Sequence, residues 1–212
     1  MNQYIDHTNL KMDATIQDIE RLCEEAKKYH FETVCVHPYY VPFAKKCLEN
    51  TTIHVCTVVG FPLGMNTKEV KVYEAIEAVN EGADEIDMVI NVGALKDRDY
   101  DYIKDEIEEV RDAIDGKVLK VIIETCYLTK DEMIKMTEIC NETYVNFIKT
   151  STGFGPKGAE VEDVALLYEN KNDILEIKAA GGIHTLAEAE KFIEAGATRI
   201  GTSHGVDIME GE

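Results

Sequence analysis

The stretch Glu81-Gly-Ala-Asp-Glu-Ile-Asp-Met-Val-Ile90 joins the end of one helix to a complete strand. Gly82 is typical of a residue that ends a helix, because glycine adopts a left-handed conformation at little cost. From Glu85 onward, apolar and β-branched residues predict a short strand that ends at Ile90. The segment Glu194-Ala-Gly-Ala-Thr198 repeats the same helix end before another short strand. A helix followed at once by a strand indicates the alternating units of an α/β protein.

The same alternation continues along the whole chain. Short apolar runs predict eight strands, at residues 4–6, 33–36, 54–59, 85–90, 119–123, 146–149, 175–179 and 199–201. Between them, apolar residues recur at steps of three and four, and two helices begin with the capping boxes Thr129-x-x-Glu132 and Thr185-x-x-Glu188. Eight such units in 212 residues predict an α/β fold, a single (β/α)8 TIM barrel. The alternative is an open doubly wound sheet, but no G-x-G-x-x-G follows the first strand.

Length and hydropathy predict one domain over residues 1–212. The longest apolar stretch, residues 55–65, is interrupted by Gly60, Pro62 and Gly64, so we expect no transmembrane segment. The first residues lack the basic patch and apolar run of a secretory signal. These features predict a cytoplasmic protein.

The charge of the chain excludes several classes of partner. Forty-one acidic residues against 22 basic ones give a formal net charge of -19. This charge repels nucleic acids and anionic membrane surfaces, so neither is an expected partner. A phosphorylated metabolite would need a site built locally from backbone N–H groups and a few hydroxyls or lysines.

The six cysteines do not predict a metal centre. They are scattered, without a C-x-x-C pair, so structural zinc is not expected. Cys35, Cys56 and Cys126 lie in or beside predicted strands, where a free cysteine usually packs as a small hydrophobic residue.

Reactive side chains gather at the predicted C-terminal strand ends, where (β/α)8 barrels place their active sites. They are Asp6 and Thr8 on the first strand, Asp87 and Asn91 on the fourth, Lys120 and Glu124 on the fifth, Lys149 on the sixth and Lys178 on the seventh. Alternation places Asp87 on one face with Glu85. If this face points inward, lysines and carboxylates must interleave, because an isolated buried ion costs several kcal/mol.

Two lysines in one partly desolvated cavity indicate amine chemistry. Burial and a neighbouring ammonium both favour the neutral amine, which attacks an aldehyde or ketone to form an imine. Asp87 would then transfer the protons. Alternatively, Lys149 and Lys178 are outward-pointing strand ends or members of salt bridges without catalytic roles. The small residues that follow them, Ser151-Thr-Gly153 and Ala180-Gly-Gly182, favour the catalytic interpretation.

Glycine-rich turns predict where a phosphate group would bind. The loops after strands seven and eight commonly form the phosphate site of a TIM barrel. Gly181-Gly182 and Gly201-Thr-Ser203 fall in these two places. A pair of glycines is more often only a turn, but the position beside Lys178 favours a phosphate site.

Seven segments, in order, resemble deoxyribose-phosphate aldolase along nearly the whole chain. They are Ile5-Asp-His-Thr-Asn-Leu10, Val34-Cys-Val-His-Pro38, Val58-Val-Gly-Phe-Pro62, Glu85-Ile-Asp-Met-Val-Ile-Asn91, Lys120-Val-Ile-Ile-Glu-Thr125, Phe147-Ile-Lys-Thr-Ser-Thr-Gly-Phe154 and Ile177-Lys-Ala-Ala-Gly-Gly-Ile183. The resemblance implies a class I aldolase without metal or other cofactor. Such an enzyme reversibly cleaves 2-deoxy-D-ribose 5-phosphate to D-glyceraldehyde 3-phosphate and acetaldehyde, in deoxyribonucleotide catabolism. It also implies a homo-oligomer, a dimer or tetramer.

The resemblance assigns roles by position. Lys149 would form the Schiff base, Lys178 would favour its neutral amine, and Asp87 would relay protons through a bound water with help from Thr152. Asp6, Thr8 and Lys120 would line the site, and Cys35 would lie near the aldehyde pocket. The implied phosphate-binding residues are Gly153, Gly181, Gly182, Gly201 and Ser203.

Three positions are not explained by the resemblance. His204 stands where many members have Ser or Ala, Lys157 lies in an unusual Gly155-Pro-Lys-Gly158 loop, and Glu176 shares a strand face with Lys178. Two other functions remain open: a related Schiff-base aldolase for another sugar phosphate, and a barrel that binds sugar phosphates without turnover.

Overall fold

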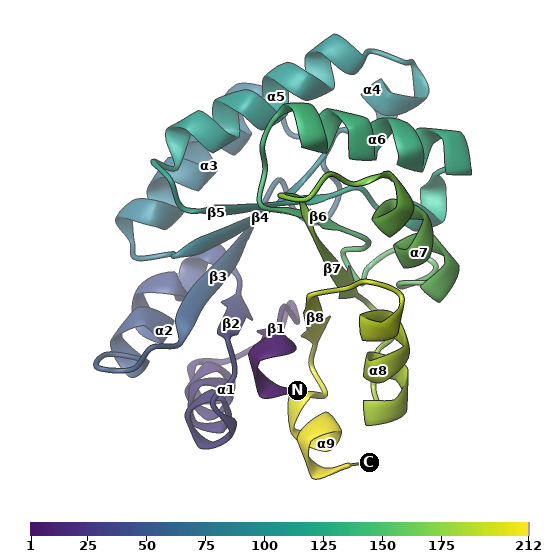
Figure 1. The fold of residues 1–212 in the computed structure, drawn as a ribbon. Coiled ribbons are helices and arrows are strands. Elements are labelled where there is room, and N and C mark those ends of the chain that lie inside the picture. The colour runs from purple at the N-terminus through teal and green to yellow at the C-terminus, as the bar shows by residue number, and fades with distance from the viewer. Residues whose placement is uncertain (212) are drawn as a thin grey trace.

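A closed parallel barrel forms the centre of the computed structural model, which describes residues 1–211. Its strands pair in chain order, from β1 to β8 and back to β1 (Figure 1). They are β1 (Ile5–Asn9), β2 (Thr33–Val36), β3 (His54–Val59), β4 (Glu85–Val89), β5 (Val118–Ile122), β6 (Phe147–Lys149), β7 (Glu176–Ala180) and β8 (Arg199–Thr202). The predicted (β/α)8 barrel is therefore confirmed, and the open sheet is excluded.

Helices surround this barrel (Figure 1). They are α1 (Ile16–Tyr29), α2 (Val41–Cys47), α3 (Lys68–Asn80), α4 (Val92–Lys96), α5 (Tyr100–Ala113), α6 (Lys130–Glu142), α7 (Val161–Asn170), α8 (Leu186–Glu194) and α9 (Gly205–Glu210), with short 3-10 helices at Asn2–Tyr4, Pro38–Tyr40 and Thr125–Tyr127. Both predicted capping boxes are present, at Thr129 and Thr185. A third, which the sequence reading missed, pairs Thr15 with Asp18 at the start of α1.

The first strand differs most from its prediction. Strand β1 continues beyond Asp6 to Asn9, because His7, Thr8 and Asn9 pair with residues of β2. These polar residues gave no apolar pattern in the sequence. The extension places Thr8 within a strand and beside Cys35 in the register.

Alternation along the strands separates an apolar layer from a charged interior. On β4, Ile86 and Met88 belong to the main apolar core, whereas Glu85 and Asp87 are buried outside that core. Packing against the helices therefore stabilises the outer face of the barrel. This charged interior agrees with the prediction that lysines and carboxylates interleave inside the barrel.

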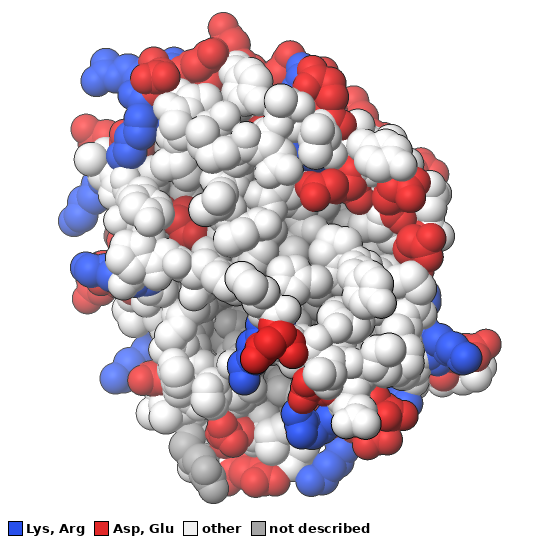
Figure 2. Space-filling model, turned by 180° about the vertical axis from the view of Figure 1, so that it is seen from behind, with Lys and Arg blue, Asp and Glu red and all other residues white. Residues whose placement is uncertain are grey.

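The acidic excess lies on the outside. Figure 2 shows charged side chains mostly toward the rim of the rear face and a broad uncharged area nearer its middle. Among the described residues, no helix combines the length and the apolar character that a membrane span requires.

Candidate active site

Asp87 is the centre of the buried charges. Its Oδ2 accepts hydrogen bonds from Lys149 Nζ at 2.7 Å and Lys178 Nζ at 2.8 Å. Its Oδ1 accepts one from Lys120 Nζ at 2.8 Å. Burial alone would raise the pKa of Asp87, but attraction to Lys120, Lys149 and Lys178 outweighs it and holds the pKa well below its usual range. Asp87 is therefore ionised.

Lys178 is held as a cation by two carboxylates. Besides Asp87, it pairs with Asp6 Oδ2, and the other oxygen of Asp6 lies 2.7 Å from Arg199 Nη1. Burial lowers the pKa of Lys178, but Asp6 and Asp87 more than reverse this effect and raise it above its ordinary value. Lys178 thus keeps its proton beside Lys149.

A deeper layer completes the charge pairing. Glu85 lies 2.5 Å from Lys120 and 3.2 Å from Arg199. Burial opposes the charge on Lys120, but Asp87, Cys56 and Glu85 raise its pKa well above the usual value. Each buried ion in this interior has an oppositely charged partner, which offsets part of the cost of its burial.

Two groups of side chains have the right composition for a metal ion. They are Cys35, Cys56 and Asp87, and Asp6, Cys56 and Glu85. However, Lys120 Nζ lies 3.3 Å from Cys56 Sγ and 2.8 Å from Asp87 Oδ1. Because an ammonium already occupies the position between these ligand atoms, the donor set does not fit a metal ion here.

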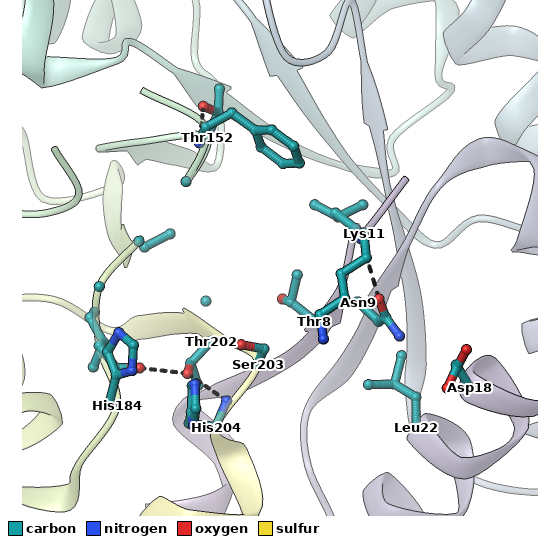
Figure 3. Close-up of a pocket in the computed structure, with 18 of the residues that line it drawn as sticks. Thr8, Asn9, Lys11, Asp18, Leu22, Thr152, His184, Thr202, Ser203 and His204 are labelled. Carbon is teal, nitrogen blue, oxygen red and sulfur yellow. Dashed lines mark hydrogen bonds between the residues drawn. The ribbon is translucent and has the colours of Figure 1, made fainter. Parts of the chain in front are cut away.

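A cavity of about 660 Å³ borders this charge cluster at Lys149. Figure 3 shows a close-up of residues that line the cavity. Lys149 is in its lining and is 3% exposed, whereas Lys120 and Lys178 are fully buried. The walls come from β1 and the following loop, α1, and the loops after β6, β7 and β8. Of the three interior lysines, Lys149 is the one placed to meet a ligand.

The residues expected to line the site lie at two depths. Thr8 and Thr152 are in the cavity wall. Asp6, Cys35 and Lys120 instead lie outside the lining and are fully buried inside the barrel. Their contact with a ligand in the cavity would be indirect, through other side chains.

Thr152 is bonded differently from the expected arrangement. Its hydroxyl donates to Glu124 Oε2, and its backbone N–H donates to Glu124 Oε1 at 3.2 Å. No hydrogen bond joins it to Asp87 within residues 1–211. Glu124 therefore fixes the loop after β6. In the sequence, only its position at a strand end marked this carboxylate.

Three of the four predicted phosphate-site glycines have positive φ. These angles are +86° at Gly153, +88° at Gly181 and +77° at Gly182. All three, together with Ser203 and Gly201, are in the cavity lining. In the loop Gly155-Pro-Lys-Gly158, the glycine at position 158 is required by a close approach of two backbones. A Cβ at Gly158 would lie 2.1 Å from the carbonyl oxygen of Gly181.

Gly201 has a separate packing role. A Cβ there would lie 2.9 Å from Lys178 Cε and 3.0 Å from the Cβ of Ala180. Its lack of a side chain therefore leaves room for Lys178 inside the barrel.

Several charged residues were missed or left unassigned by the sequence reading. Lys11 and Arg21 line the cavity, and Arg21 is paired with Asp18 at 2.6 Å. They precede or lie within α1, so no strand-end pattern marks them.

The two charged residues that the resemblance left unexplained lie away from the cavity. Lys157 is exposed and is paired with Glu160 at 3.0 Å, as expected of a solvated side chain. Glu176 begins β7, at the opposite end of the strand from the cavity.

The chain has close relatives among known proteins. A model of the DeoC/LacD family of aldolases matches residues 1–211. The deoxyribose-phosphate aldolase of Dictyoglomus turgidum is 54% identical, over 100% of this chain and 99% of that protein. A crystal structure of a putative deoxyribose-phosphate aldolase from Coccidioides immitis has a TM-score of 0.96 at 41% identity, covering 99% of this chain and 84% of that one. The tetrameric deoxyribose-phosphate aldolase from Aeropyrum pernix has a TM-score of 0.92 at 30% identity, covering 99% and 89%.

Proposed function

The chain belongs to the DeoC/LacD family of aldolases, and we propose that it is an aldehyde-lyase that reversibly cleaves 2-deoxy-D-ribose 5-phosphate to D-glyceraldehyde 3-phosphate and acetaldehyde. One observation carries the proposal. Lys149 alone of the three interior lysines lines the cavity, and its Nζ lies 2.7 Å from the ionised Asp87. This places an amine and a proton acceptor together at the floor of a ligand-sized space.

The proposed reaction begins with attack of the Lys149 amine on C1 of the open-chain sugar. Loss of water gives an iminium ion, which draws electrons from the neighbouring bonds. Removal of the proton from the 3-hydroxyl breaks the C2–C3 bond, releases glyceraldehyde 3-phosphate and leaves an enamine on Lys149. Protonation of C2 and hydrolysis then release acetaldehyde and restore the amine. Asp87 is the proposed proton carrier.

Lys178 supports this chemistry through its charge. Asp6 and Asp87 hold it protonated, and it bonds the same oxygen as Lys149. A fixed cation at this position disfavours a second cation on Lys149 and thus favours the nucleophilic amine. We propose that Asp6 and Lys120 act by positioning Asp87 and Lys178.

The opposite end of the substrate would bind the glycine-rich loops. Backbone N–H groups at Gly153, Gly181 and Gly182, with the hydroxyl of Ser203, are the proposed donors to the phosphate group. Lys11 lies in the same lining, whereas the charge of Arg21 there is paired with Asp18. These features support a phosphorylated substrate despite the net charge of -19.

A product assay tests this proposal. Purified protein is incubated with 2-deoxyribose 5-phosphate, and glyceraldehyde 3-phosphate and acetaldehyde are quantified. We expect both products in equal amounts, and none from Lys149→Met. Cleavage of a different sugar phosphate only would indicate a related Schiff-base aldolase. Binding of sugar phosphates without any cleavage would indicate a non-catalytic barrel.

We further propose a homo-oligomer in the cytoplasm. The Aeropyrum pernix relative is a tetramer, which supports a dimer or tetramer here. All six cysteines are free, as is usual in a reducing compartment. Gel filtration with light scattering measures the oligomeric state directly.

A further inference from the structure

Glu124 combines a strained backbone with a buried carboxylate beside the cavity wall. It follows β5 with φ +54° and ψ +66°, in the left-handed region that non-glycine residues rarely adopt. Among residues 1–211, six non-glycine residues have positive φ, and the five others are exposed. Glu124 is only 5% exposed. Backbone strain of this kind clusters at functional sites and persists only where surrounding contacts hold the residue.

The carboxylate of Glu124 holds one residue of the cavity wall, Thr152. Its Oε1 accepts the backbone N–H of Thr152 at 3.2 Å, and its Oε2 accepts the Thr152 hydroxyl. The Thr152 oxygen in turn accepts the N–H of Phe154 at 3.0 Å. A hydroxyl has one proton and two acceptor lone pairs. The proton is therefore committed to Glu124, and one lone pair remains.

This remaining lone pair of Thr152 is available to a ligand. Within residues 1–211, no group other than the Phe154 N–H donates to the Thr152 oxygen. Thr152 lines the cavity together with Lys149, and Figure 3 shows it across the cavity from Ser203, a proposed phosphate donor. A substrate held there by its phosphate would present its carbon chain to Thr152. The hydrogen-bond donors on that chain are hydroxyl groups.

We propose that Glu124 is a positioning residue that makes the Thr152 oxygen an acceptor only, so that the site selects aldehydes carrying a hydroxyl group next to the carbonyl. This inference rests on the proposed function, because it concerns the aldehyde that joins or leaves the enamine on Lys149. D-Glyceraldehyde 3-phosphate has such a hydroxyl. An aldehyde without it leaves the lone pair of Thr152 unpaired in the filled cavity, which costs free energy.

Addition of acetaldehyde to two acceptor aldehydes tests this role. D-Lactaldehyde differs from propanal only by the hydroxyl next to the carbonyl, and we expect the wild type to prefer it in kcat/KM. In Glu124→Gln, one amide oxygen must serve two donors of Thr152, so this preference should fall about fivefold. The matched control Glu160→Gln alters an exposed carboxylate outside the cavity lining, and should keep the preference.

A double-mutant cycle shows whether Glu124 acts through Thr152. Thr152→Val removes the acceptor and should lower the preference about tenfold. Adding Glu124→Gln to this variant should lower it no further. Equal losses for both aldehydes in Glu124→Gln would show a merely structural role and overturn the inference, as would a further fall in the double variant. An unchanged preference in Thr152→Val would refute it even if Glu124→Gln does not fold.

Proton NMR measures the hydrogen bond without turnover. A threonine hydroxyl proton held by a buried carboxylate exchanges slowly with water, so the wild type should show one such resonance that Thr152→Val lacks. In Glu124→Gln this resonance should shift or disappear. Its absence from the wild type would refute the inference whatever the activity. Its presence in a protein that adds acetaldehyde to neither acceptor would refute the proposed function instead, and with it the selection of the aldehyde.

Discussion

Lys149 Nζ lies 2.7 Å from Asp87 Oδ2, and this oxygen also accepts a hydrogen bond from Lys178 at 2.8 Å. One carboxylate oxygen thus lies between the side-chain nitrogens of two lysines. Lys178 has a second carboxylate, Asp6, whereas the cavity lies over Lys149. This asymmetry makes Lys149 the lysine that a substrate in the cavity can reach.

Replacing Lys178 should change the pH dependence of imine formation. Lys178→Met removes the fixed cation that favours the neutral amine of Lys149. We expect kcat to fall at least tenfold and the pH of half-maximal imine formation to rise by about one unit. Borohydride trapping across a pH series measures this midpoint. Circular dichroism must first show a folded variant, since Asp6 loses a partner. An unchanged midpoint in folded protein would mean that Lys178 does not tune the nucleophile.

Asp87→Asn should remove catalysis and part of the acid sensitivity of the fold. The amide keeps the shape but not the charge that three lysines share. We expect kcat to fall by about 10² or more and stability at neutral pH to fall by about 3 kcal/mol.

The pH dependence of stability follows from the low pKa of Asp87 in the folded protein. Ionised Asp87 stabilises the fold above its unfolded pKa of about 3.9, and this contribution is lost as the pH falls below that value. Urea unfolding between about pH 7 and pH 3 should therefore show a steeper loss for the wild type than for Asp87→Asn. Parallel curves would show that Asp87 contributes nothing to this acid sensitivity.

Gly201→Ala should act on kcat through Lys178. The added Cβ would lie 2.9 Å from Lys178 Cε, and the fully buried lysine would have to shift. We expect kcat to fall about tenfold to a hundredfold and KM to change less than about threefold. A large rise in KM with normal kcat would instead favour a role of Gly201 in phosphate binding.

A second buried ion pair lies between α3 and α5. Lys71 Nζ is 2.6 Å from Glu106 Oε1 and donates to the Val89 carbonyl oxygen at 2.8 Å, while Glu106 Oε2 accepts from the Asn91 N–H. Burial lowers the pKa of Lys71 and raises that of Glu106, so each charge depends on the other. The pair therefore holds the end of β4, just beyond Asp87.

A double-mutant cycle with Lys71→Met and Glu106→Leu tests this dependence. Each single variant should lose about 3 to 5 kcal/mol of unfolding free energy. The sum of the two losses should exceed that of the double variant by about 2 kcal/mol. Additive losses would show that the two residues do not stabilise each other.

The sequence predicted the barrel well because its strands carry apolar residues on their outer faces. It also predicted the charged strand ends, including Asp87, Lys149 and Lys178. It could not show which charges meet, because pairings such as Arg199 with Asp6 and Glu85 join β8 with β1, its neighbour in the closed barrel, and with β4 across the barrel. Nor could it show that Thr152 bonds Glu124. The extent of one domain over residues 1–212 stays a prediction, and Glu212 lies outside the described residues.

The most direct test of the account is to trap the imine. The protein is incubated with acetaldehyde and borohydride, its intact mass is measured, and the modified peptide is mapped. We expect one added ethyl group on Lys149, and none in Lys149→Arg. An ethyl group on Lys178 or Lys120 instead, or no adduct in folded protein, would contradict Lys149 as the Schiff-base lysine.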